Sequence, residues 1–588
     1  MSDGRLPVRR RWLGWTIGLL LTFLVLSIGW VTIRGIGAVT ELQRVASLSS
    51  QLKSAVGDGD LEKADSIAQR IGHHARSARD LTSDPIWQMF GALPWLGPNF
   101  TAVGEVAAIA DDISSDAVAP VLTAAQDLNL SSLGFSNSTI DLEPFSTIEP
   151  SLADAAATMS AAEERARRID ADQTVPALAD AVREMRSTVT QAATLVGALH
   201  GASALLPSML GATEPRNYVV AMQNNAELRS SGGIIGAIAL LHADKGRITL
   251  SAQTSVADFP ALDVPLALSD STIALFEDRP GRYLQNITNI PDFTEAAPLI
   301  ATRWQDRFGT PVDGVIAVDA VMTKNLLGAT GPITFGPFTA DTDNVVGLLL
   351  SDLYAAVPDP GAQDKMFAQA ATALFGAAMS DADPKDLIAA LAQSSEEGRV
   401  RIWSAHADEQ ELIAPTTLSG ALPTDTSSAT YVGVLFNDAT GGKMDYYADA
   451  EITTAMGTCN GQPTTQIRLT WTNNAPADAA TSLPAYVTAS GWYNVPPGSI
   501  RTLIAVYGPE GATASHIDRD GESDAVQATM LGTRYAVQHD VTLAPGESTT
   551  ITVEFQGTGA GARLTELAHT PLVRDPQTRN AELQCAAV

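Results

Sequence analysis

At 588 residues the chain is too long for one ordinary domain, so two or three are expected. Its 66 Asp and Glu residues outnumber its 37 Lys and Arg residues, which gives a formal net charge of −29. Such an acidic surface repels nucleic acid and anionic lipid headgroups, so the composition argues against nucleic acid as a partner.

The first 33 residues have the pattern of a membrane anchor. Residues 12–33 contain no charged side chain and are long enough for a helix to cross the hydrocarbon core. Arginines at positions 5, 9, 10 and 11 place the preceding end in the cytoplasm. The alternative is a cleaved signal peptide, but the apolar run is longer than a signal core and no clear cleavage site closes it. We expect a cytoplasmic tail over 1–11, a transmembrane helix over 12–33 and, because no second run of comparable length follows, an extracellular remainder.

Residues 36–205 have the apolar spacing of three and four that is typical of helices. Residues 57–60 interrupt the first helix. A short segment starts at Asp84-Pro85 and ends in a turn rich in Pro and Gly over residues 93–98, and we expect its aromatic side chains to pack on the bundle. A polar connection is expected around residues 129–150. The pattern predicts an antiparallel helical stalk or bundle, through which a homo-oligomer is possible.

Two regions with other periodicities follow. Over residues 212–420, β-type runs alternate with amphipathic helices, which predicts an α/β domain. Over residues 425–588, evenly spaced strands separated by Gly, Pro, Asn and Asp predict a β-sandwich. Cys459 and Cys585 are the two cysteines, and on the oxidising side of a membrane we expect a disulfide rather than two thiols.

The string QNNAELRSSGG, residues 223–233, lies between two apolar strands of the α/β region. A loop held by rigid elements is a common place for a site, and a Gly pair lets the backbone approach a ligand. The candidate ligand-binding residues are Asn224, Asn225, Glu227 and Arg229, whose guanidinium suits phosphate or carboxylate. The alternative is a structural network in which Arg229 pairs with Glu227 or a more distant carboxylate and pins the loop.

Other carboxylates suggest either a cation site or ordinary helix and turn chemistry. Asp313 and Asp319 flank the apolar run GVIAV and are candidate ligands for a divalent cation, although Asp residues at strand ends are also common turn formers. Asp292 is expected to cap the helix that follows it. The sequence has no GxSxG, Walker, HExxH or CxxC motif, so it indicates none of these enzyme classes and no cofactor.

The stretch LLPSMLGATEPRNYVVAMQNNAELRSSGGIIGAI resembles the signature of DUF4012, an actinobacterial domain of unknown function. NITNIPDF, DGVIAVDAVMTKNLLGATGPI, DNVVGLLLSDLY and FNDATGGKMDYY resemble further parts of that family. The resemblance covers most of the chain and implies an anchor, a helical region with an LPWLG-like turn, the signature domain and a β-rich tail. It also implies a role in the cell envelope and its polysaccharides.

The order of elements more distantly resembles the LytR-CpsA-Psr domain, which transfers polyprenyl-pyrophosphate-linked glycans onto the cell wall. Residues 229–232, RSSG, stand where that family has Arg-Ser-Asp-Thr. The arginines that the family carries near positions 253–255 and 351–354 are absent here. Because several cations normally neutralise a pyrophosphate, binding or scaffolding fits these residues better than catalysis.

Three functional hypotheses follow. The first is an envelope-assembly protein that binds a glycan, a polyprenyl-linked precursor or an assembly partner. The second is an Mg²⁺-dependent glycan phosphotransferase, which requires Arg282, Arg303 or Arg307 to converge on Arg229. The third is a purely structural, self-associating scaffold whose α/β domain has a filled interior where a lipid tail would otherwise lie.

Overall fold

The computed structural model describes residues 8–127, 138–380, 382–423, 430–559 and 565–585. It divides into two compact units, one comprising Met1–Leu133 and Asp141–Pro207 and the other comprising Gly134–Ile140 and Ser208–Val588. The chain is therefore multidomain, with an apolar N-terminal helix and several sheets, as predicted. Most of the predicted cytoplasmic tail, residues 1–7, lies outside the described residues.

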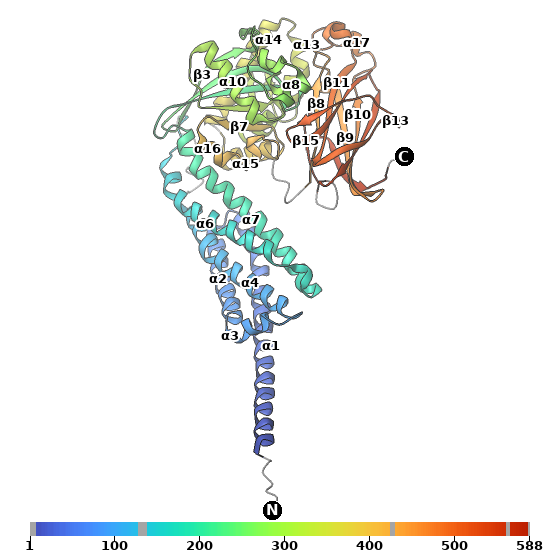
Figure 1. Ribbon diagram of the computed structural model, residues 1–588. Coiled ribbons are helices and arrows are strands. Elements are labelled where there is room, and N and C mark those ends of the chain that lie inside the picture. The colour runs from blue at the N-terminus through green and yellow to red at the C-terminus, as the bar shows by residue number, and fades with distance from the viewer. Residues whose placement is uncertain (1–7, 128–137, 381, 424–429, 560–564, 586–588) are drawn as a thin grey trace, which may run out of the picture. The chain divides into compact units, whose positions relative to one another are not determined.

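The first unit is helical (Figure 1). Its α-helices are α1 (Val8–Gly57), α2 (Leu61–Thr82), α3 (Pro85–Gly91), α4 (Gly97–Ile113), α5 (Ala119–Asp127), α6 (Glu143–Arg168) and α7 (Pro176–Met209), of which α7 ends just inside the second unit. The predicted span and the start of the predicted stalk form one continuous helix, because no proline interrupts α1. Asp60 ends the predicted break by capping α2, accepting the Lys63 N–H at 3.0 Å.

Two sequence predictions for this unit need correction. The expected connection over 129–150 is shorter, because α6 already begins at Glu143; residues 128–137 lie outside the described part. Two helical segments, Leu21–Gly57 and Pro176–Met209, are apolar and long enough to span a membrane, whereas the sequence predicted one. In the second, Val182, Val189 and Val196 recur every seven residues and are buried in a core shared with α4 and α6.

The second unit begins with an α/β region. Its strands are β1 (Arg216–Arg229), β2 (Gly232–Asp244), β3 (Arg247–Ser255), β4 (Gly314–Asp319), β5 (Ile333–Phe335), β6 (Phe338–Ala340) and β7 (Val400–Ser404). Its helices are α8 (Asp270–Phe276), α9 (Arg279–Arg282), α10 (Phe293–Phe308), α11 (Ala320–Thr330), α12 (Val345–Gly347), α13 (Leu353–Ala356), α14 (Pro360–Ser380), α15 (Pro384–Glu396) and α16 (Ala407–Ile413).

The main sheet of this region has the order β3-β2-β1-β4-β7, while β5 and β6 pair separately. β1 runs antiparallel to β2 and parallel to β4. The core on one face joins β1 to α10 through residues that include Val219, Phe293 and Trp304. Asp292 caps α10 by accepting the Thr294 N–H at 2.9 Å, which confirms the predicted cap. The central strand β1 carries the candidate site at its C-terminal end.

Two further sheets complete the second unit. Their strands are β8 (Thr430–Asp438), β9 (Ala448–Cys459), β10 (Gln462–Asn473), β11 (Ile500–Glu510), β12 (Ala512–Arg519), β13 (Glu522–Ser523), β14 (Gln527–Leu531), β15 (Arg534–Leu543), β16 (Ser548–Gly557), β17 (Thr565–His569) and β18 (Gln577–Glu582); α17 (Ala479–Ser482) lies between β10 and β11. The sheet orders are β13-β12-β16-β10-β9-β18 and β14-β15-β11-β8-β17. Both sheets contribute to one core, which includes Phe436, Trp471 and Phe555.

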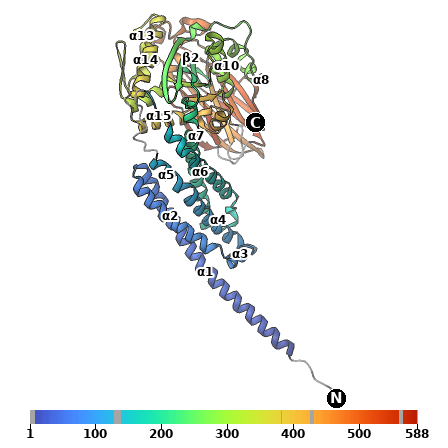
Figure 2. The same cartoon turned by 90° about the vertical axis from the view of Figure 1, so that its left-hand side faces the viewer.

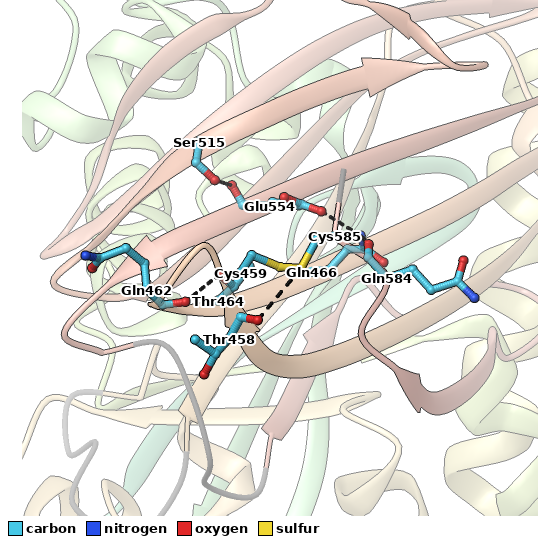
Figure 3. Close-up of a disulfide and its surroundings, with 9 residues drawn as sticks. All are labelled: Thr458, Cys459, Gln462, Thr464, Gln466, Ser515, Glu554, Gln584 and Cys585. Atoms are coloured by element: carbon cyan, nitrogen blue, oxygen red, sulfur yellow. Dashed lines mark hydrogen bonds between the residues drawn. A yellow bond between two sulfur atoms is a disulfide. The ribbon is translucent and has the colours of Figure 1, made fainter. Parts of the chain in front are cut away.

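The last strand is held to this region in two ways. β18 pairs with β9 in parallel register. Cys459 at the end of β9 and Cys585 after β18 form a disulfide with a Cα–Cα distance of 5.7 Å, the pairing that the sequence predicted (Figure 3). Beside it, the Gln466 amide donates to the Gln584 carbonyl oxygen at 2.8 Å. The C-terminal segment is thus fixed to the sheet by a covalent bond and by side-chain contacts.

Candidate functional site

The polar string, residues 223–233, is the tight hairpin end of β1 and β2 rather than an open loop. Its β1 half pairs irregularly, with register shifts after Met222 and between Asn224 and Leu228. A Cβ on Gly232 would lie 2.1 Å from Gln223 Oε1, and a Cβ on Gly233 would lie 2.3 Å from the Asn224 backbone. The Gly pair therefore permits close packing within the hairpin. From the sequence, the Gly pair was expected to let the backbone approach a ligand.

Glu227 lies between two cations in the interior. One carboxylate oxygen is 2.9 Å from Arg229 Nη2, and the other accepts a hydrogen bond from Lys443 Nζ. All three side chains are buried. Burial alone would raise the pKa of Glu227, but Lys443 and Arg229 outweigh it and lower that pKa. The structural alternative, in which Arg229 pairs with Glu227, describes this arrangement, and Lys443 is a partner that the sequence analysis did not identify.

The same string joins the α/β region to the two-sheet region. The Leu228 side chain is fully buried in the core shared by the two sheets. Its N–H donates to Asp445 Oδ2 at 2.8 Å, and the Ser230 N–H donates to Asn437 Oδ1 at 2.9 Å. The end of β1 therefore connects the two regions, and we call this connection the joint. It consists of the buried Leu228 side chain surrounded by buried polar contacts.

Two carboxyl groups at this joint are harder to ionise than usual. Burial raises the pKa of Asp438 to about 6, and the negative charge of Glu227 contributes to the shift. Burial also raises the pKa of Asp445 well above its usual range, with Asp438 as a further cause. The joint thus contains one carboxylate held ionised by two cations and two carboxyl groups whose pKa is raised by burial.

The two candidate asparagines have different surroundings. Asn225 is fully buried and donates to Asp319 Oδ2 at 3.0 Å and to the Pro571 carbonyl oxygen at 3.1 Å. Asn224 is half-buried, and its amide donates to the Tyr354 hydroxyl at 2.5 Å. The Tyr354 ring centre lies 5.6 Å from that of Tyr486, whose side chain is 50% exposed. Asn224 is therefore the member of the string that connects to the surface.

Tyr486 belongs to a loop, residues 483–495, that we call the aromatic loop. Trp492 and Tyr493 of this loop are 67% and 65% exposed. Four of its non-glycine residues have left-handed φ values: Ala489, Ser490, Tyr493 and Asn494. Such backbone conformations cost free energy and are found preferentially at functional sites. The sequence analysis missed this loop, although aromatic residues set among Ser, Gly, Asn and Pro are a detectable signal.

The aromatic loop packs on the turn before η8 (Met444–Tyr447), close to the joint. The Lys443 N–H donates to the Val487 carbonyl oxygen at 2.8 Å, and Lys443 Nζ lies 5.7 Å from the centre of the Tyr486 ring. A Cβ on Gly441 would lie 2.5 Å from the Tyr493 ring, so that ring is seated directly on the turn. Lys443 therefore contacts both the buried Glu227 and the exposed aromatic loop.

The structure corrects the cation hypothesis for Asp313 and Asp319. They stand at opposite ends of β4, about 20 Å apart at the usual rise of a strand. Asp313 pairs with Arg216 at 3.2 Å and His406 at 2.9 Å, whereas Asp319 pairs with Arg399 at 3.0 Å and caps α11. Since β4 separates them, the two carboxylates cannot share one cation. Within the described ranges, no group of three or more His, Cys, Asp or Glu residues is arranged to hold a metal ion.

The arginines required by the phosphotransferase hypothesis bind elsewhere. Arg282, Arg303 and Arg307 each donate to backbone carbonyl oxygens within residues 258–263. In the described part of the chain, the cation that approaches the string from β7 is instead Arg401, which donates to the Ser231 carbonyl oxygen. Burial lowers the pKa of Arg401 to about 10. The predicted convergence of Arg282, Arg303 and Arg307 on Arg229 is therefore wrong.

A sheet with the order β3-β2-β1-β4-β7, whose central strand ends in a buried polar joint, defines an α/β domain built to dock on the two-sheet region. Residues 213–354 match the family model described as protein of unknown function, DUF4012. This match confirms the DUF4012 prediction over these residues, which include both the polar string and Tyr354. No curated protein matches the chain.

Proposed function

We propose that this protein is a membrane-anchored extracellular component of cell-envelope polysaccharide assembly that binds a glycan on its aromatic loop. The observation that carries the proposal is the exposure of Tyr486, Trp492 and Tyr493 on one short loop with a strained backbone. Exposed apolar groups gathered in one place on a folded surface are typical of binding sites. Sugar rings present C–H faces that stack on aromatic rings while their hydroxyl groups stay in water.

The rigidity of the loop supports binding further. A glycan pays less for ordering a site whose side chains are already held in place. Tyr493 is seated on Gly441, and Tyr486 is held by the Tyr354 ring, which Asn224 fixes through its hydrogen bond. In this account Asn224 positions the aromatic surface, while Asn225, Glu227 and Arg229 hold the joint beneath it.

The anchor is supported by the exposure pattern of α1. Large apolar side chains between residues 19 and 36 are exposed: Leu19, Leu21, Phe23, Leu24, Val25, Leu26, Ile28, Trp30, Ile33 and Ile36. Apolar side chains exposed over most of the surface of one helix are favourable in lipid and unfavourable in water. With the N-terminus in the cytoplasm, the Cys459–Cys585 disulfide lies on the oxidising side of the membrane, where such bonds persist.

A binding role is favoured over transfer because the polar string is internally paired. A phosphotransferase must direct several cations at a pyrophosphate, whereas Arg229 is committed to Glu227 and to the Leu228 carbonyl oxygen. A LytR-CpsA-Psr-like fold for residues 212–420, a β-sandwich for residues 425–588 and self-association through the helical unit stay predictions. A polyprenyl-linked precursor presents the same kind of sugar rings and falls within the proposed ligand class.

The test is binding of the full-length protein, in detergent micelles, to the insoluble envelope polysaccharide of the producing cells. We expect the double variant Trp492→Ser/Tyr493→Ser to bind at least about fivefold more weakly, since each aromatic contact contributes about 0.5–1.5 kcal/mol. Its thermal midpoint should change little, because both side chains are largely exposed. Trp95→Ser, which removes an exposed tryptophan from the other unit, is the matched control. Equal binding by the double variant and the wild type would overturn the proposal.

A further inference from the structure

The turn between α3 and α4 exposes a compact set of apolar side chains. We call them the apolar tip: Met89, Leu93, Trp95 and Leu96. Trp95 is 93% exposed and has a left-handed φ of 68°. The sequence predicted that the aromatic residues of the segment 84–98 pack on the bundle. Trp87 of α3, which is only 4% exposed, confirms that prediction, whereas Trp95 contradicts it.

The apolar tip also lacks charge. From Pro85 to Gly104 the chain contains no charged residue, although its net charge is −29. Acidic groups near the tip would repel anionic headgroups and carry a strong penalty for entering lipid. Their absence from this stretch leaves its own side chains apolar, while Glu105 and Asp170 line a hollow on the side of Gly91 and Pro98.

Contacts of α3 place the apolar tip beside the outer end of the apolar run in α1. Arg34 is the first charged residue after the apolar run, and its Nε lies 2.8 Å from Oδ2 of Asp84, the residue that caps α3. Val31, inside the apolar run, is buried in one cluster with Trp87. Ser27 is also buried, and at the rise of an α-helix it lies about 10 Å along the axis from Arg34. Figures 1 and 2 both show α3 against α1 where α1 leaves the bundle.

We infer that the apolar tip inserts into the outer interface of the same bilayer that α1 crosses; this inference rests on the proposed anchor. The outer end of the run 12–33 and the tip lie at the same position along the axis of α1. The lipid that surrounds that end of the run therefore also reaches the tip. A depth of about 10 Å or less is typical of interfacial insertion, and tryptophan favours that zone. The helical unit would then contact the membrane at two points, which restricts its tilt relative to the bilayer.

The test uses single-cysteine variants of the full-length protein in nanodiscs of phosphatidylethanolamine and phosphatidylglycerol. The two native cysteines are paired, so a thiol-specific spin label reacts at the introduced position. Labels at Trp95→Cys, Leu24→Cys and Gln191→Cys report the tip, the anchor and an exposed position on α7. Electron paramagnetic resonance then compares collisions with oxygen, which concentrates in lipid, and with a water-soluble nickel chelate.

We expect oxygen to dominate at positions 24 and 95 and the nickel chelate to dominate at position 191. A lipid-exposed label at 24 together with a water-exposed label at 95 would overturn the inference while leaving the anchor intact. A water-exposed label at 24 would overturn the anchor and the inference that rests on it. Dipolar broadening between labels at 95, with low access to both reagents, would show a contact between two copies and would also overturn the inference.

Discussion

The polar string and the aromatic loop lie close together in the fold but show opposite relations between chemistry and exposure. The string, residues 223–233, contains amides, a carboxylate and a guanidinium, yet Asn225, Glu227 and Arg229 are buried and paired. The aromatic loop contains no charged residue, yet it exposes Trp492 and Tyr493 on a left-handed backbone. The residues with the most varied functional groups therefore form a buried contact within the protein. The surface that is available to a ligand is formed by uncharged, largely aromatic residues.

The difference has a clear energetic basis. A charge in the interior is tolerated only with partners, so Glu227, Arg229 and Lys443 must be placed together or not buried at all. An exposed aromatic ring is not stabilised by contact with water, but it can be stabilised by packing against a partner. Burial therefore commits the string to structure and leaves the aromatic loop available for recognition.

The largest expected effect comes from breaking the buried ion pair. Glu227→Gln leaves Arg229 and Lys443 buried without a counter-charge between them and should destabilise the second unit by about 3–5 kcal/mol. Thermal and urea unfolding of the full-length protein measure this loss. The control is Glu451→Gln, which removes the exposed partner of Arg579 and should cost less than about 1 kcal/mol. Similar losses for the two variants would show that the joint is not held by its charges.

Reduction of the Cys459–Cys585 bond should have the next largest effect, about 2–4 kcal/mol, because it releases a constraint across 126 residues of sequence. The thermal midpoint of the wild type with and without reductant reports it. The double variant Cys459→Ser/Cys585→Ser should behave like the reduced protein and should not respond to reductant. Glycan binding should be retained below the lowered midpoint. A loss of binding on reduction under those conditions would mean that the aromatic loop depends on the far edge of the sheet.

A smaller effect should come from breaking the hydrogen bond that links the polar string to the aromatic loop. Asn224→Ala and Tyr354→Phe each remove the same hydrogen bond, worth about 0.5–1.5 kcal/mol. Both variants should weaken glycan binding by about tenfold or less, because Tyr354 holds Tyr486. Stability and binding measured around the double-mutant cycle should be non-additive. Additive losses would show that Asn224 does not act through Tyr354.

The smallest effect concerns pH. The pKa of Asp438 is raised from 3.8 to about 6, so its protonated form is favoured by folding. Its contribution to stability is therefore present below about pH 4 and lost as the pH rises through about 6. Asp438→Asn should remove this part of the pH dependence of the thermal midpoint. Glu227, whose pKa is lowered, contributes with the opposite sign. An unchanged slope between pH 4 and pH 6 would contradict the assignment.

Local patterns were sufficient for the features that depend on near neighbours. The capping of α10 by Asp292 needs only the next turn of helix, and the apolar character of residues 12–33 needs only composition. Lys443 could not be predicted as the partner of Glu227, because 216 residues separate them and no spacing rule connects them. Trp87 and Trp95 lie eight residues apart, and which of them is buried depends on the path of α1 beside α3.

The most direct test of the central claim is hydrogen exchange, followed by mass spectrometry, on the full-length protein with and without solubilised envelope polysaccharide. Both regions are then observed in one experiment. The account predicts slower exchange in residues 484–494 on addition of polysaccharide and no change in residues 223–233, all of which except Asn224 are already buried. Protection confined to residues 223–233 would contradict it and would return the ligand to the polar string.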